Sequence, residues 1–138
     1  MSSIIAYQKH IDTLSTKELN LPIGENNQRL GVELATVDGV TYVSIPDDVA
    51  LPSDQPAEIA QSINTITLTP ALTLAISNAS PHMKLIRQQV ADLISEQYSF
   101  SDEIKLLRTA PSADFEVYND YVEQCRQFGR DKKQALGL

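Results

Sequence analysis

The sequence has a single cysteine, no tryptophan and only five glycines among 138 residues. One cysteine, Cys125, cannot form an internal disulfide, which favours a reducing compartment over a small secreted domain stapled by disulfides. So few glycines leave little room for phosphate-cradling loops, and neither a dinucleotide-binding nor a P-loop motif is present. With few aromatic residues as well, the core must consist mainly of leucine, isoleucine, valine and alanine.

Basic residues are scarce in the first half of the chain. Residues 1–60 contain nine acidic residues and three basic ones, a net charge of −6, whereas residues 61–138 have a net charge of −1. Such a surface repels phosphate backbones, so we expect no nucleic-acid partner. A basic patch on another protein is a better match for this charge, although acidity also serves solubility.

The sequence also lacks a run of about 20 apolar residues, the length that a membrane-spanning helix needs. Its first residues do not show the basic and then apolar pattern of a signal peptide. We therefore expect a cytoplasmic protein with no membrane partner.

The clearest structural signal is the alternation of apolar and polar residues around Asp38–Gly39. Residues 30–37 and 40–45 alternate on either side of this pair, which is typical of a type I′ hairpin turn. Centring the turn there predicts the cross-strand pairs Val37–Val40, Leu34–Val43 and Val32–Ile45. One face of the hairpin is then apolar and the other mixed, which predicts a core on one side and solvent on the other.

The segment before the hairpin is ambiguous. Ile4, Ile5 and Tyr7 fit either a strand or a helix, and Thr16–Leu19 has the composition of one helical turn. Gly24–Asn27 is a turn by composition.

A link rich in proline and aspartate, Pro46–Pro56, follows the hairpin and should end the sheet. We place the domain boundary here. Residues 1–55 form an acidic β-rich module and residues 56–138 a helical module, either separately or together as one compact domain.

Helix start signals divide residues 56–138. A short helix over 56–63 and an extended stretch over 64–68 come first, and then Thr69-Pro70 and Ser80-Pro81 begin two longer helices. Ser101 is predicted to cap a helix over 102–108, and the last helix is predicted to run from about Ser112 to Gly129. The predicted fold class is α+β: an N-terminal β-hairpin or small antiparallel sheet followed by a C-terminal bundle of three to four helices.

Residues capable of chemistry are present, but none shows the pattern of an active site. His10 and His82 have no second histidine or cysteine at metal-ligand spacing, and Cys125 lies in an apolar helical stripe, where a thiol is buried and inert. The carboxylate pairs Asp47–Asp48 and Asp102–Glu103 fall in a turn-forming link and at a helix start. We therefore predict no catalytic residue, no cofactor and no metal site.

Three segments of the helical half carry a family resemblance: Ser80–Ile86, Tyr98–Arg108 and Tyr118–Arg130. With these, residues 56–138 resemble small proteins encoded in tailed-phage and prophage structural regions. The layout is similar to that of tail-fibre or baseplate accessory proteins and tail assembly chaperones. The resemblance implies a non-enzymatic role and a location in the cytoplasm of the bacterial host or in the virion.

Two hypotheses follow for function, with an unrecognised enzyme as a third. The first is a phage or prophage tail-associated structural or assembly protein that binds a tail or fibre component, itself, or both. The second is a small acidic inhibitor or regulator that covers a basic site on a host protein. In either case we expect the recognition surface on the hairpin half, at Glu33, Asp38, Tyr42, Asp47 and Asp48. A stripe in the last helix (Phe115, Tyr118, Tyr121 and Phe128) is expected to be core rather than interface.

Overall fold

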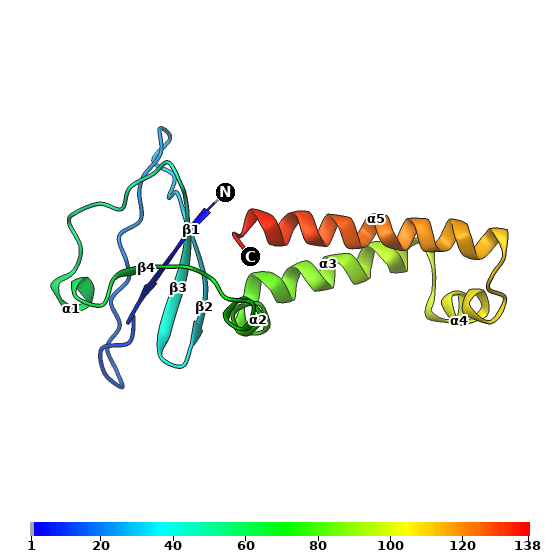
Figure 1. The fold of residues 1–138 in the computed structure, drawn as a ribbon, viewed down its shortest axis with the longest axis horizontal. Helices are drawn as coiled ribbons and strands as arrows, with labels where there is room; N and C mark the ends of the chain where they lie inside the picture. The colour runs from blue at the N-terminus through cyan, green and yellow to red at the C-terminus, as the bar shows by residue number, and fades with distance from the viewer. Residues whose placement is uncertain (1) are drawn as a thin grey trace. The chain divides into compact units, whose positions relative to one another are not determined.

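The fold is known from a computed structural model that describes residues 2–138. Its elements, in chain order, are β1 (Ser2–Tyr7), β2 (Val32–Val37), β3 (Val40–Pro46), α1 (Ala57–Ala60), β4 (Asn64–Ile66), α2 (Pro70–Ala79), α3 (Pro81–Gln97), α4 (Phe100–Arg108) and α5 (Ala113–Ala135). Figure 1 shows the antiparallel sheet and the helices that follow it. The α+β class is confirmed.

The chain forms two compact units. Unit 1 extends to Met83 and also includes Ala135–Leu138, and unit 2 is Lys84–Gln134. This division differs from the boundary expected at 55/56. Pro46 ends β3 and residues 47–56 of the link lack helices and strands, but the chain returns to the sheet after it, because β4 pairs with β1 and α2 packs on β2. The prolines mark a break in secondary structure and not the end of a unit.

The sheet of unit 1 has the strand order β2-β3-β1-β4, and β1 pairs antiparallel with both of its neighbours. The four consecutive residues Ile4–Tyr7 of β1 are all buried. Because successive side chains of a strand point to opposite faces, both faces of the sheet must be covered. The expected solvent-exposed face is therefore wrong.

Each face of the sheet has its own core. On the first, which we call the Ile5 face, the buried residues are Ile5, Tyr7, Leu19, Val43, Ile45 and Ile59. On the second, the Ile4 face, they are Ile4, Leu34, Ala35 and Ile76. The Ile5 face is covered by α1 and by loop residues such as Leu19. The Ile4 face is covered by α2 and by the C-terminal residues Leu136 and Leu138.

The hairpin forms where it was predicted, but its register is correct only next to the turn. Val37 pairs with Val40, while Glu33 pairs with Val43 and Val32 with Ser44. The register shifts between Glu33 and Ala35, a β-bulge that sends the neighbours Leu34 and Ala35 into the same core. The predicted pairs Leu34–Val43 and Val32–Ile45 are wrong for this reason.

Residues 8–29 form loops that lie between β1 and β2. Thr16–Leu19 is not a helical turn: the Lys17 N–H donates to the carbonyl of Lys9 at 3.0 Å, and Thr16 bridges His10. The turn at Gly24–Asn27 is confirmed by the hydrogen bond from the Asn27 N–H to the Gly24 carbonyl at 3.1 Å.

Hydroxyl caps fix the starts of the helices. The Thr69 side chain accepts from the Leu72 N–H at 3.1 Å, and Pro70 takes the first helical position, as predicted. The cap of α4 is Ser99 and not Ser101. Ser99 accepts from the Asp102 N–H, and the Asp102 carboxylate accepts from the Ser99 N–H, so the two residues form a capping box.

In unit 2, α3 and α5 pack along one another, with α4 between the end of α3 and the start of α5 (Figure 1). The buried residues of unit 2 are Ile86, Tyr118, Val122 and Cys125, so the predicted burial of Cys125 is confirmed. The predicted end of the last helix at Gly129 is wrong, since α5 continues to Ala135. Gly129 is instead a contact point: a Cβ there would lie 2.9 Å from Cγ2 of Val90 on α3.

Because of this contact, we predict that the effect of Gly129→Ala on the free energy of unfolding has opposite signs with and without the Val90 side chain. Gly129→Ala adds about 1 kcal/mol of helix propensity, but overpacking against the stiff Val90 side chain costs about 1–3 kcal/mol. We expect Gly129→Ala to lower the free energy of unfolding in the wild-type background and to raise it in a Val90→Ala background. Urea denaturation of the four proteins measures both, and an equal effect in the two backgrounds would contradict the contact.

Candidate functional site

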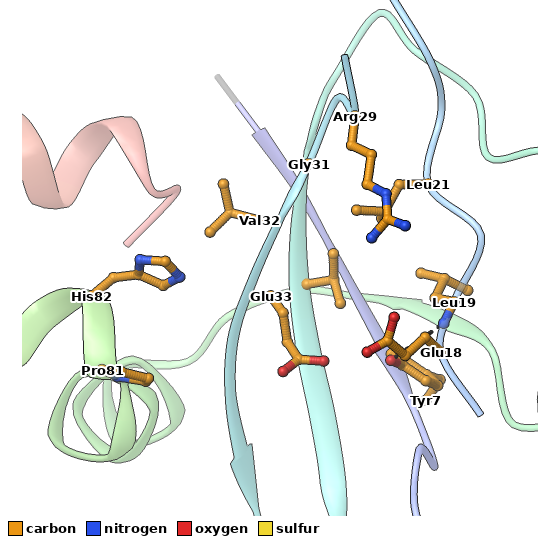
Figure 2. A pocket seen from close by; sticks show the side chains of 11 residues that line it. Tyr7, Glu18, Leu19, Leu21, Arg29, Gly31, Val32, Glu33, Pro81 and His82 are labelled. Atoms are coloured by element: carbon orange, nitrogen blue, oxygen red, sulfur yellow. Dashed lines mark hydrogen bonds between the residues drawn. The ribbon is translucent and has the colours of Figure 1, made fainter. Parts of the chain in front are cut away.

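A hollow of about 470 Å³ lies beside β2 in unit 1. Its polar lining is Tyr7, Glu18, Arg29, Glu33 and His82, and its apolar lining includes Leu19, Leu21 and Val43. Figure 2 shows Tyr7, Glu18 and Glu33 on one side of β2, and Pro81 and His82 on the other. The hollow therefore brings together residues that are far apart in the sequence.

The two carboxylates of this hollow, Glu18 and Glu33, share one cation, Lys9. The Lys9 ammonium donates to both carboxylate oxygens of Glu33, at 3.0 and 3.3 Å, and lies 3.9 Å from Glu18. The hydrogen bond to Glu33 holds the pKa of Lys9 above its ordinary value. Lys9 thus connects the loop after β1 to the edge strand β2. The carboxylates of Glu18 and Glu33 therefore have a structural role.

Tyr7 forms the floor of the same hollow. Its hydroxyl accepts a hydrogen bond from the Leu19 N–H at 3.4 Å, and burial raises the pKa of Tyr7. The phenol is therefore neutral at physiological pH and cannot serve there as a base. Arg29 and His82 are exposed in the lining of the hollow, where their side chains can hydrogen-bond to a polar group of a ligand.

The five residues predicted for recognition do not form one surface. Glu33 lies on the Ile5 face and is bound to Lys9, whereas Tyr42 packs with the core of the Ile4 face. Asp38 is exposed in the hairpin turn with a φ of 51°. Asp47 and Asp48 are exposed just after β3, where Asp47 accepts from the Ser3 hydroxyl at 2.7 Å. Their role in binding a partner stays a prediction.

A second candidate lies in unit 2, on the outer side of α4. Phe100 is 78% exposed, Leu107 is 61% exposed and Ile104, between them, is 38% exposed. Steps of four and three residues place the three side chains on one side of a helix, where they form a continuous apolar strip, here called the α4 stripe. No residue of α4 is buried.

Contacts beside the α4 stripe hold α4 against α5. The Tyr118 hydroxyl of α5 donates to Glu103 at 2.8 Å, and Leu106 is half-buried. Tyr118 is itself packed edge-on against Tyr98, with ring centroids 4.9 Å apart. With the Ser99–Asp102 capping box, these contacts fix which side of α4 faces solvent.

The α4 stripe was missed in the sequence because of a displaced cap. A helix that begins after Ser101 excludes Phe100, and Ile104 and Leu107 alone do not form a stripe. The signal that could have found it is Asp102 three residues after Ser99, the spacing of a capping box.

Two further observations concern residues 2–138 as a whole. They contain no cluster of three or more histidine, cysteine, aspartate or glutamate side chains arranged to hold a metal ion. None of the helices in this range has the length and apolar composition needed to cross a bilayer.

In comparisons with known proteins, no family model, no curated protein and no solved structure matches the chain. The two candidate sites are therefore described from the structure alone. The resemblance of residues 56–138 to phage tail-region proteins stays a prediction.

The ion pairs of Lys9 predict its titration. Glu33→Gln should lower the pKa of Lys9, because the shorter contact with Glu33 is its main cause, whereas Glu18→Gln should change it less. A raised lysine pKa stabilises the fold fully below the ordinary lysine pKa, and that contribution is lost as pH rises through the folded value. NMR titration of the Lys9 side chain in the three proteins checks the order, and a larger effect of Glu18→Gln would contradict it.

Proposed function

We propose that this protein is a non-enzymatic structural or assembly component that works by protein–protein contact through the α4 stripe. The observation that carries the proposal is the exposure of Phe100 and Leu107 on a helix that is held by Tyr118 through Glu103 and by a capping box at its start. Burying a side chain of this size contributes about 1.5–3 kcal/mol, and aromatic anchors are frequent among interface hot spots.

Association with a phage or prophage tail is the more specific part of this proposal, and it is supported by the resemblance of residues 56–138. Assembly components of this kind bind tail or fibre proteins, and an exposed stripe on a preorganised helix is a suitable docking element. The order of genes around the coding sequence tests this part directly. Tail genes on both sides support it, and a neighbourhood without them contradicts it.

A second candidate function, an acidic regulator of a basic protein, is favoured by a different observation. All nine acidic residues within residues 1–60 are exposed, and only Glu18 and Glu33 form ion pairs within the part of the chain that the structure describes. Binding through these charges would weaken steeply as ionic strength rises, whereas binding through the α4 stripe would tolerate salt.

Site-specific crosslinking tests the role of the α4 stripe. We expect a photoreactive residue at Leu107, introduced in the native host, to give discrete adducts that are identified by mass spectrometry. The matched control is the same residue at Gln124, which is exposed on α5 outside the stripe. Equal labelling from the two positions would contradict the proposed function.

A further inference from the structure

The strand β2 has an open edge. Within residues 2–138 it pairs only with β3, whose residues direct their N–H and C=O groups alternately toward β2 and toward β1. Val40 faces β2, because it closes the two-residue turn with Val37, so Val43, three residues later, faces β1. Glu33 is the partner of Val43 on β2. The N–H and C=O groups of Glu33 therefore point away from β3, toward the open edge.

The hollow described above lies at this edge. Its lining includes residues 31–33, and it also includes Tyr7 and Val43 from the Ile5 face. Pro81 and His82 belong to the same lining but lie on the other side of β2 (Figure 2). Since its walls come from both sides of an edge strand, the hollow extends around that edge. The empty space is thus where the next strand of the sheet would run.

The charge of unit 1 favours a cationic partner. Residues 61–83 and 135–138 contain no charged side chain, so unit 1 has the net charge of −6 found for residues 1–60. At the hollow, Lys9 donates hydrogen bonds to Glu33, whereas its distance to Glu18 is 3.9 Å, and the Glu18 side chain is 66% exposed. Glu18 therefore has room for a second cation. Arg29, the positively charged residue of the lining, opposes such a cation.

We propose that the open edge of β2 binds an extended segment of another protein as an added strand, with a lysine or arginine of that segment beside Glu18. In this mode of recognition the main chains supply the hydrogen bonds, and pockets for alternate side chains supply the specificity. The surface belongs to unit 1. The inference thus goes beyond the function proposed for the α4 stripe and does not depend on it.

The walls of the hollow indicate which side chain enters it. Leu19, Leu21 and Val43 are apolar, and Glu18 supplies a carboxylate. A long cationic side chain can lay its methylene groups on such walls while its charged end reaches the carboxylate. Because side chains alternate along a strand, the neighbouring residues of the segment point to the other side of β2, toward Pro81 and His82.

The β-bulge limits the length of the added strand. It lies between Glu33 and Ala35, and it interrupts the regular spacing of the groups that β2 directs outward. Regular pairing is therefore confined to the residues before the bulge, which are those beside the hollow. Bulges of this kind also protect a sheet edge against unspecific pairing. We expect a short, weak contact, with a Kd on the order of a hundred micromolar.

A synthetic peptide tests the pairing of the main chains. The probe is a capped peptide of about eight residues in which lysine and valine alternate. NMR titration of the full chain measures its Kd, and the Glu33 amide should gain protection from hydrogen exchange on binding. Two further peptides have N-methyl groups on all lysines or on all valines. Because only one edge of an added strand faces β2, one of them should bind about tenfold more weakly and the other nearly unchanged.

The outcomes that overturn the proposal are equally specific. Equal effects of the two sets of N-methyl groups would show that no peptide edge pairs with β2. Absence of binding up to millimolar peptide, or binding without protection of the Glu33 amide, overturns it as well.

Charge variants test the place of the cationic side chain in the hollow. At physiological salt we expect Glu18→Gln to weaken binding of the probe about threefold, and Arg29→Gln to tighten it. Glu58→Gln is the matched control, since it removes the same charge from an exposed position on α1 outside the hollow and should leave the Kd unchanged. A peptide with glutamate in place of lysine should not bind. Equal effects of Glu18→Gln and Glu58→Gln contradict the contact with Glu18.

Leu107→Asp separates this inference from the proposed function. It alters the α4 stripe in unit 2 and should leave binding of the probe unchanged, because the open edge of β2 belongs to unit 1. Loss of probe binding in this variant, with its helix content kept in circular dichroism, contradicts the site at β2. Failure of the peptide experiments leaves the crosslinking test of the α4 stripe unaffected.

Discussion

Ile4, Ile5, Ala6 and Tyr7 are consecutive, buried and in an inner strand of the sheet, and the rest of unit 1 is organised around that constraint. Side chains that alternate between two faces can all be buried only if both faces are covered. Residues 2–138 form no second sheet with which to do this. It uses α2 and two C-terminal leucines on one face, and α1 with the loop residues 8–29 on the other. The irregular segment between β1 and β2 is therefore part of the core.

The sequence predicted those features of the fold that depend on a few adjacent residues. The Asp38–Gly39 turn, the Thr69-Pro70 start and the Gly24–Asn27 turn each follow from local backbone chemistry. The strand β1 could not be assigned, because four successive apolar residues have neither the helical nor the strand period. The β-bulge at Leu34 was hidden too, since it depends on two neighbours sharing one core, which alternation along a single strand does not reveal.

The candidate sites could not be predicted in this way, because they depend on contacts between residues far apart in the sequence. Glu33 was expected on an open recognition surface, but Lys9, 24 residues earlier, occupies its carboxylate. The exposure of Phe100 and Leu107 depends on which side of α4 meets Tyr118 of α5, and no spacing within α4 decides that. The burial of Cys125 could be predicted from the sequence, because apolar neighbours at helical spacing are enough to predict a buried thiol.

Unit 2 interrupts the chain of unit 1, since residues 84–134 stand between Met83 and Ala135. This connectivity has a consequence for the newly made protein. During synthesis the strands emerge from the ribosome first, but the Ile4 face lacks Leu136 and Leu138 until translation has passed through all of unit 2. Unit 2 can thus complete its packing before unit 1 does. Until then the nascent sheet has α2 alone on its Ile4 face, and the part of that apolar face that Leu136 and Leu138 will cover stays open.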